Sequence, residues 1–321
     1  MIPLKPSGIK KKILSFALII LFVFLNMNKS IAQKIEYLEL CYNADSLLRI
    51  NENHKAFELY HAAFGKYKGR LDPNDLYNAS CAAARIGDIK VALSYLWQLL
   101  KETNFHSKKE LIEDQDLIPV RQSKEWPEII SLAERKDSTA KSRVNANLQN
   151  KLEKLIDEDQ LYRKRRELVL QENGDKNKIN VIEDSMAITD KRHVKFMRDL
   201  IHKYGWLSRD EVGDNGATAI WAIVQHADDD IEFQKTSLEL LKKVCASGKV
   251  SRTEVALLTD RILISEKKQQ LYGTQLKRSK SNGKWYPIDL FDPPNVDKRR
   301  AEMDLFAIQH YLYSVNKTTI K

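Results

Sequence analysis

The chain has 321 residues, a formal net charge of +9 and 43% hydrophobic residues, and a chain of this length suggests about two domains. Five lysines and no acidic residue precede Gln33, so removing that segment would leave a net charge of +4. This mild excess is spread over mixed-charge segments, which argues against a nucleic-acid partner, because nucleic-acid-binding proteins gather basic residues on one face.

Residues 1–32 have the composition of a secretory signal peptide, with a basic start, an apolar run from Ile13 to Leu25 and a polar end at Ala32. Cleavage is predicted before Gln33. The alternative is a retained membrane anchor, but an apolar run of about a dozen residues is shorter than the ~20 that a spanning helix needs. We therefore expect an exported protein, periplasmic or extracellular, that is soluble and has no membrane span after cleavage.

Residues 33–135 are predicted to form a helical repeat domain. Two segments, which begin at Ala56 and Ala92, align with a period of 36 residues. Small residues recur where two helices must approach closely, in a pattern that resembles the tetratricopeptide helical hairpin. The later positions of that pattern hold Tyr60 and Ala63 in the first unit, but Leu96 and Leu99 in the second.

The repeat leaves two interpretations open. Repeats of this kind bind peptides or neighbouring domains on a concave face, so a protein or peptide partner is one expectation. The other is a helical cap that only stabilises the second domain, because fold alone does not decide function.

The odd number of cysteines, Cys41, Cys81 and Cys245, leaves open whether the first two form a disulfide bond.

A polar bridge over residues 133–142 is predicted to lead into a second, mainly helical domain at residues 145–315. Its first helix, over residues 144–171, carries a basic cluster at residues 163–166, which is either a solvated face or an anion site. Ser208 and Glu211 have the spacing of a capping box. The later predicted elements are a loop over 212–217, a largely buried helix over 217–244, extended segments over 271–275 and 284–288 around a turn, and a last helix over 296–314. The fold class is therefore mainly α, with a short extended hairpin near the C-terminal end.

Polar side chains of catalytic type gather between Trp221 and Gln275. His226, Asp230 and Gln234 are four residues apart, so one helix would align them in a single polar ridge. Three interpretations of the ridge are open. It could be a structural hydrogen-bond network, a metal-free site in which Asp230 tunes His226 as a general base, or a metal site in which Asp260 is the third ligand. The catalytic candidates are His226, Asp230, Asp260 and Arg261, and the ligand-binding candidates are Gln234, Tyr272, Gly273, Thr274 and Gln275.

A set of short motifs between Leu148 and Leu312 resembles a bacterial family, the domain of unknown function 6624. The motifs are Asp159-Gln160, Tyr162-Arg163, Gly205-Trp206, Val212-Gly213, QHADDDIEFQ, LTDRI, QLYGTQ and DPPNVDKRRAEM. The resemblance implies a domain boundary and groups His226, Gln234, Asp260, Arg261 and residues 272–275 as one unit. It implies no activity and no cofactor.

Two functions follow as expectations. The first is a binding or scaffolding protein of the cell envelope, with a polar ligand pocket in the second domain. The alternative is a hydrolase-type enzyme that uses His226 as general base, with Asp230 or Asp260 and with Arg261 to stabilise negative charge. One observation separates the two functions: these side chains either converge on an open cleft or are buried and hydrogen-bonded to one another.

Overall fold

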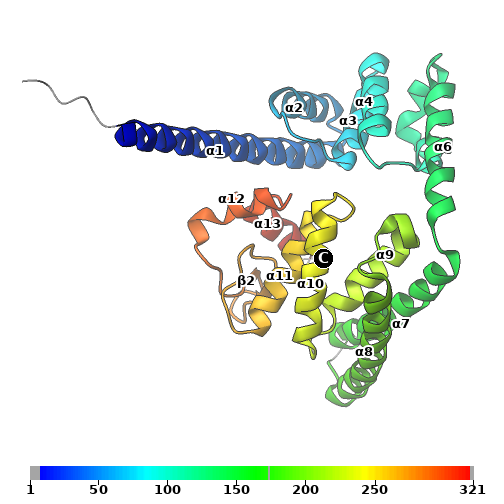
Figure 1. Cartoon of the computed structure of the whole chain (residues 1–321). Coiled ribbons are helices and arrows are strands. Elements are labelled where there is room, and N and C mark those ends of the chain that lie inside the picture. Colours follow the sequence, from blue (N-terminus) through cyan, green and yellow to red (C-terminus); the bar gives the residue numbers. More distant parts are fainter. Residues whose placement is uncertain (1–7, 173, 319–321) are drawn as a thin grey trace, which may run out of the picture. The chain divides into compact units, whose positions relative to one another are not determined.

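The computed structural model describes residues 8–172 and 174–318, with side chains over 28–172 and 174–317. Helices dominate the described residues, and the only sheet among them is a short antiparallel hairpin (Figure 1). This confirms the mainly α fold class. The first seven residues of the predicted signal peptide lie outside the described residues. No helix in the described ranges is long and apolar enough to cross a membrane.

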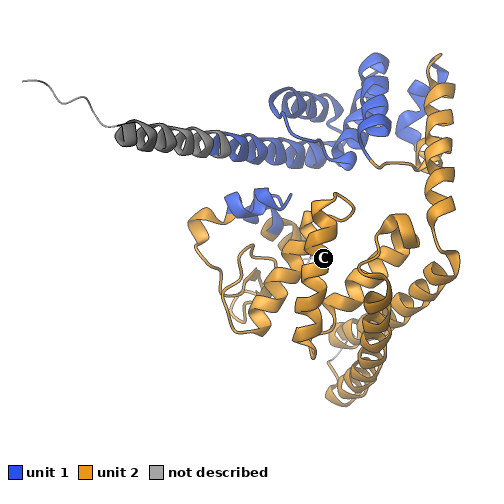
Figure 2. Ribbon diagram, viewed as in Figure 1, with its two compact units in different colours: residues 1–103, 115–123, 297–311 blue, residues 104–114, 124–296, 312–321 orange. Residues whose placement is uncertain are grey.

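The chain divides into two compact units, which Figure 2 colours separately. The first contains the described residues up to Thr103, Gln115–Ser123 and Asp297–Tyr311; the second contains Asn104–Asp114, Lys124–Val296 and the described residues from Leu312 onward. The late segment 297–311 thus belongs to the same unit as the N-terminal helices. The predicted domain limits at residues 135 and 145 stay a prediction.

Helix pairs build the first unit. Helix α1 (Gly8–Leu48) packs on α2 (Asn53–Lys66), and α3 (Pro73–Arg85) packs on α4 (Ile89–Glu102) and on the 3-10 helix η1 (Gln115–Gln122). The alanines that the repeat pattern singled out, Ala56, Ala63 and Ala92, are fully buried. Small side chains at these positions let the helix backbones approach closely. Cys41 and Cys81 are also buried, and both are thiols.

The predicted last helix is interrupted. Helix α12 (Val296–Glu302) and helix α13 (Ile308–Thr318) are separate elements, and the backbone turns between them at Asp304, where φ is +57°. Within the first unit, the His310 ring stacks on Tyr42 of α1 at 3.9 Å between centroids, and His310 Nε2 lies 2.6 Å from Glu39 Oε2. These contacts tie the segment after Asp297 to α1.

The second unit contains α5 (Lys108–Glu113), α6 (Trp126–Arg143), α7 (Ala146–Glu172), α8 (Lys176–Tyr204), α9 (Arg209–Gln225), α10 (Ile231–Ala246) and α11 (Arg252–Ser265). Helix α7 packs on α8 and α9, and α10 packs on α11. Helix α6 runs through the predicted polar bridge over residues 133–142, so this segment is helical. Charged residues at this density are compatible with a solvated helix, so polarity alone did not mark a linker.

The start of α9 confirms the predicted capping box. Ser208 accepts a hydrogen bond from the backbone of Asp210, and the Glu211 carboxylate accepts one from the backbone N–H of Ser208 at 2.8 Å. The loop predicted over residues 212–217 is wrong, because the helix continues and is only kinked at Gly213. There φ is +69°, and a Cβ would lie 3.1 Å from Gln149, so glycine suits both the backbone and the close approach.

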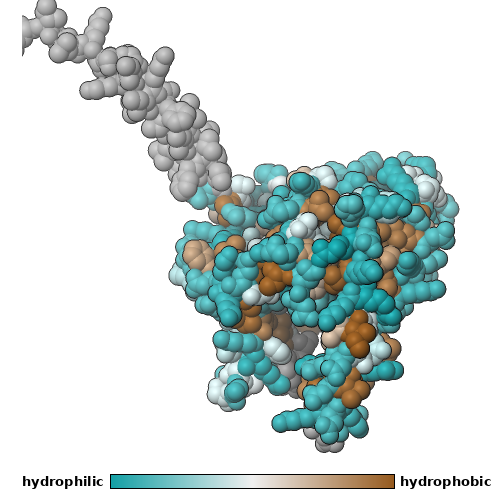
Figure 3. Space-filling model, turned by 60° about the horizontal axis from the view of Figure 1, so that its bottom comes forward, coloured by the Kyte–Doolittle hydropathy of each residue, from teal (hydrophilic) through white to brown (hydrophobic). Residues whose placement is uncertain are grey.

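Helices α7 and α8 form a hairpin whose outer surface is not uniformly polar. On α7, Leu152 is fully buried, whereas Leu161 is 45% exposed. Hydrophobic residues interrupt the hydrophilic surface in the lower right part of Figure 3, where this hairpin lies.

The strands are β1 (Leu276–Arg278) and β2 (Trp285–Pro287), with Lys277 opposite Tyr286. The second strand falls inside its predicted segment. The first begins at Leu276, directly after the predicted segment 271–275 ends. Hydrogen bonds to Asp260 and Gln270 hold residues 271–275 in a tight loop, so they form no strand.

Candidate functional site

The polar ridge predicted on a single helix does not exist. Helix α9 ends at Gln225 and α10 begins at Ile231, so the prediction of one helix over residues 217–244 is wrong. His226 is the C-terminal cap of α9. Asp230 is the N-terminal cap of α10, where its Oδ1 accepts a hydrogen bond from the Phe233 backbone N–H at 3.1 Å. Aspartate is among the preferred N-cap residues, which explains the new helix start within an otherwise apolar stretch.

Gln234 has a structural role. Its side chain is fully buried, and its Nε2 donates to the carbonyl oxygens of Val224 at 3.2 Å and Gln225 at 3.1 Å. The last carbonyls of a helix lack partners within that helix. Gln234 therefore supplies donors to the end of α9 and fixes the loop that carries His226.

Asp260 also has a structural role. Its side chain is fully buried on α11, and its carboxylate accepts hydrogen bonds from the backbone N–H groups of Leu271 at 2.7 Å, Tyr272 at 3.1 Å and Thr274 at 3.0 Å. It also accepts from the Thr274 hydroxyl at 3.0 Å. A carboxylate surrounded by donors is satisfied, so Asp260 organises the segment 271–274.

The same segment is held from a second side by Gln270, which the sequence analysis did not single out. Its Oε1 accepts from the Gln275 backbone N–H, and its Nε2 donates to the Gln275 carbonyl oxygen, both at 2.9 Å. Gly273 has a φ of +71° inside this turn. Tyr272, Gly273, Thr274 and Gln275 thus form a tight loop built around Asp260 and Gln270, which is why no strand begins before Leu276.

Arg261, the neighbour of Asp260, points to a different partner. Its guanidinium forms two hydrogen bonds of 2.6 Å to Asp228, one to each carboxylate oxygen. It therefore ties α11 to the loop between α9 and α10. Among the described residues, no metal-binding group combines His226 with Asp230 and Asp260.

His226 instead meets two residues of α7. Its Nδ1 lies 3.0 Å from Asp159 Oδ1 and 3.0 Å from Arg163 Nε. Arg163 follows Asp159 by one helical turn and donates from its Nη2 to Asp159 at 2.8 Å. The same Nη2 reaches Asp190 of α8 at 3.0 Å. Helices α7 and α8 and the C-terminal cap of α9 thus contribute to one cluster of Asp159, Arg163, Asp190 and His226, here called the α7 cluster.

The neighbours of His226 determine which of its two ring nitrogens carries the proton. An arginine N–H cannot donate to a ring nitrogen that carries a proton, so the two contacts of Nδ1 exclude each other as hydrogen bonds. Arg163 Nε has Asp159 as another acceptor, at 3.2 Å from each carboxylate oxygen. We therefore assign the Nδ1 proton to the charge-assisted bond with Asp159. In the neutral ring, Nε2 then carries the lone pair.

Burial opposes the ionisation of Asp159, but the hydrogen bonds from His226 and Arg163 outweigh it and lower the pKa of Asp159 to about 2. The Asp159 side chain is 1% exposed, whereas that of His226 is 23% exposed. Burial also raises the pKa of Asp190 above its ordinary value, against the opposing effect of Arg163. A charged buried carboxylate therefore supports a histidine that reaches the surface.

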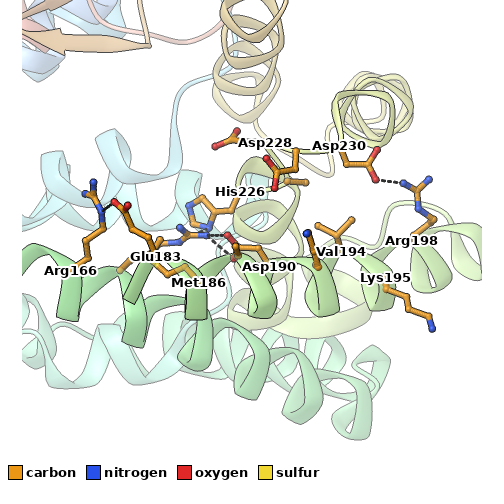
Figure 4. A pocket seen from close by; sticks show the side chains of 15 residues that line it. Arg166, Glu183, Met186, Asp190, Val194, Lys195, Arg198, His226, Asp228 and Asp230 are labelled. Carbon is orange, nitrogen blue, oxygen red and sulfur yellow. Dashed lines mark hydrogen bonds and ion pairs between the residues drawn. The ribbon is translucent and has the colours of Figure 1, made fainter. Parts of the chain in front are cut away.

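His226 lines a pocket of about 560 Å³ between α8 and the loop 226–230, which is within the size range of small-molecule sites (Figure 4). Ten of the lining residues are charged, five of each sign. They are Arg163, Arg166, Lys191, Lys195, Arg198, Glu183, Asp190, Asp228, Asp229 and Asp230. Met186, Ala187, Val194 and Ala227 add apolar surface.

Several of these charges already neutralise one another. Arg166 bonds to Glu183 at 2.6 Å, and Arg198 pairs with Asp230. In the part of the chain that the structure describes, no ion pair joins Lys191 or Asp229 to another residue. Figure 4 shows Lys195 pointing away from His226. The pocket therefore keeps both a positive and a negative group for a ligand.

The structure thus brings His226 and Asp230 to one pocket and places Gln234, Asp260 and residues 272–275 in supporting networks. The site predicted from the sequence did not include Asp159, Arg163 or Asp190. A signal existed for two of them, because Asp159 and Arg163 stand four residues apart among the motifs of the resemblance. Asp190 had no signal, since its role depends on how α8 packs on α7.

The fold and the site define a mainly helical protein of two units, with a charged pocket in which a buried aspartate supports a histidine. The family of unknown function DUF6624 matches residues 146–319, which is more than half of the chain, and the chain belongs to this family. No curated protein and no solved structure matches the chain.

Proposed function

We propose that the second unit binds a small ligand that carries both a positive and a negative charge. The observation that carries this proposal is the pocket at His226, whose charged lining residues are equally divided between the two signs. Most of these charges pair with one another, but in the described ranges Lys191 and Asp229 form no ion pair, so a net anion or a net cation would leave one of these two groups without a partner. His226 Nε2 would accept a hydrogen bond from the ligand, held in place by Asp159.

The test is a thermal-shift screen with amino acids and dipeptides as zwitterions, dicarboxylates and sugar phosphates as anions, and polyamines as cations. We expect the zwitterions to raise the Tm of the wild-type chain, because a ligand that binds only the folded state stabilises it. The increase should disappear in His226→Gln, which removes the ring at the pocket.

The matched control is His202→Gln, since His202 lies on α8 and is exposed away from the pocket residues. This variant should respond to ligands as the wild type does. Stabilisation by anions or cations alone, or equal responses of the two histidine variants, would rule the proposal out.

A second candidate function is favoured by one observation, the hydrogen bond between Asp159 and His226 Nδ1. It leaves Nε2 of a pocket-lining histidine as the basic nitrogen, the arrangement that a general base needs. In this hydrolase-type alternative Asp159 takes the part expected of Asp230 or Asp260, because those residues have other hydrogen-bond partners. Arg163 cannot act alone as an anion site while it is paired with two aspartates.

Asp159→Asn separates the two functions. If His226 is a general base, a hydrolytic activity found by screening esters, amides and phosphoesters should fall roughly 100-fold or more in this variant. The asparagine cannot stabilise the imidazolium that a base forms. Zwitterion binding that persists in Asp159→Asn without any hydrolysis of the panel by the wild type would leave only the binding function.

For the whole chain, we propose an exported binding or scaffolding protein of the cell envelope, with tetratricopeptide-like hairpins in its first unit that contact a protein or peptide partner. The support is the composition of residues 1–32 and the burial of the repeat alanines in packed helix pairs. N-terminal sequencing of the protein recovered from its native cells should begin at Gln33. A protein that still begins at Met1 would contradict export by a cleaved signal.

A further inference from the structure

Among the exposed apolar side chains of the α7–α8 hairpin, four stand at regular spacing, two on each helix. Leu161 and Leu168 of α7 are 45% and 49% exposed, and Val181 and Ile188 of α8 are 66% and 72% exposed. In each helix the two residues are seven apart, which is the spacing of a contact seam between helices. We call these four residues the hairpin seam.

The seam residues lie at two matching levels of the hairpin. Two ion pairs set the register between α7 and α8, one between Arg166 and Glu183 and the other between Glu158 and Arg192. The two helices are antiparallel because a short connection joins them. Leu168 therefore lies at the level of Val181, and Leu161 lies at the level of Ile188, one heptad further from the connection.

The seam faces away from the interior of the unit. Leu161 follows the buried Asp159 by two residues, which places it on the other side of α7. Ile188 lies one turn before Arg192, which pairs with Glu158 of α7, so Ile188 and Val181, seven residues earlier, are on the flank of α8 that adjoins α7.

Two exposed charges lie between the apolar levels. Arg165 is on α7 and Asp184 is on α8, both exposed, and in the described part of the chain neither forms an ion pair. A twofold axis parallel to the helices would set α7 of one copy across from α8 of another, antiparallel and at the same levels. Leu161 then faces Ile188, Leu168 faces Val181, and Arg165 faces Asp184, each pair formed twice.

We propose that the hairpin seam is a symmetric interface between two copies of this chain. A second copy fits the seam in both its apolar spacing and its charges, and a twofold interface must be complementary to itself in this way. The resulting arrangement is a bundle of four helices with antiparallel neighbours. A membrane surface would be matched by basic residues only, whereas the seam combines Arg165 with Asp184.

Sedimentation equilibrium of the full chain tests the interface. For a small apolar seam we expect a monomer–dimer equilibrium with a Kd on the order of 10 µM. Ile188→Glu should weaken it at least about tenfold, because a carboxylate then enters both of the Leu161–Ile188 pairs. Leu170→Glu is the matched control, since Leu170 is similarly exposed but nine residues from Leu161, on the opposite side of α7. It should leave the Kd unchanged.

A charge exchange identifies the pairing. Arg165→Asp and Asp184→Arg should each weaken the dimer, because each places like charges together, and the variant with both changes should recover the wild-type Kd. The substituted residues Arg165, Leu170, Asp184 and Ile188 are all exposed, so melting temperatures equal to that of the wild type will show that the variants fold. A wild-type chain that remains monomeric at about 100 µM, or a dimer indifferent to Ile188→Glu, overturns the proposal. Binding to anionic vesicles by the wild-type monomer would instead indicate a membrane surface.

Discussion

Asp260→Asn is expected to destabilise the second unit by about 3 kcal/mol or more. The fully buried Asp260 carboxylate accepts hydrogen bonds from three backbone N–H groups and one hydroxyl. Asparagine has the same size, but it removes the charge and turns an amide N–H₂ toward donors. Urea unfolding followed by circular dichroism will measure the loss. Hydrogen exchange should show faster exchange at the amides of Leu271, Tyr272 and Thr274.

The matched control is Asp228→Asn, which breaks the exposed ion pair with Arg261. Exposed ion pairs contribute about 0–1 kcal/mol, so this variant should unfold close to the wild type. If both substitutions cost the same free energy of unfolding, Asp260 does not organise the loop. Protected amides over residues 271–274 in Asp260→Asn would lead to the same conclusion.

Asp75→Asn is expected to stabilise the first unit above neutral pH and to remove much of the pH dependence of its unfolding. Asp75 is buried on α3, where it accepts a hydrogen bond from the Tyr37 hydroxyl. Burial raises the pKa of Asp75 to about 7, with further contributions from Asp72 and Asp45 nearby. The folded protein therefore keeps a proton on this carboxyl that the unfolded chain releases near pH 4.

The sign of the effect follows from proton linkage. Below about pH 4 both states bind the proton, and the stabilising contribution of the neutral carboxyl is complete. Between about pH 4 and pH 7 only the folded state binds it, so the free energy of unfolding falls by about 1.4 kcal/mol per pH unit, on the order of 4 kcal/mol in total. Above pH 7 the loss is complete. Asparagine is neutral throughout and avoids it.

Urea unfolding of the wild type and of Asp75→Asn at several pH values between 4.5 and 8 isolates this contribution, because the other carboxyl groups are common to both. The difference in stability between the two proteins should grow with pH and become constant above pH 7. Glu58→Gln, an exposed acid on α2, should run parallel to the wild type. A constant difference across the range would contradict a proton held at Asp75.

Local patterns in the sequence were sufficient for the helices and for several of their ends. The apolar periodicity predicted the mainly α fold, the spacing of Ser208 and Glu211 predicted the start of α9, and the small residues Ala56 and Ala92 predicted close helix packing. The motifs also led to the correct family. These features depend on residues within a few turns of one another, so they are visible in a single sequence.

Such local patterns could not predict the polar network. A regular spacing of His226, Asp230 and Gln234 predicted one helix, but Asp230 starts a new helix and Gln234 binds the end of the previous one. Helix periodicity alone could not distinguish a continuous apolar helix from two helices joined by a capped loop, because both bury similar residues.

The sequence by itself determined that this protein is helical, that its C-terminal half belongs to one family and that His226 is a candidate residue. Only the tertiary structure decided which partner His226 has. Asp159 lies 67 residues before it and meets its Nδ1 because α7 packs on α9. A buried polar group must find a hydrogen-bond partner, but the identity of that partner depends on the packing of distant helices and not on local spacing.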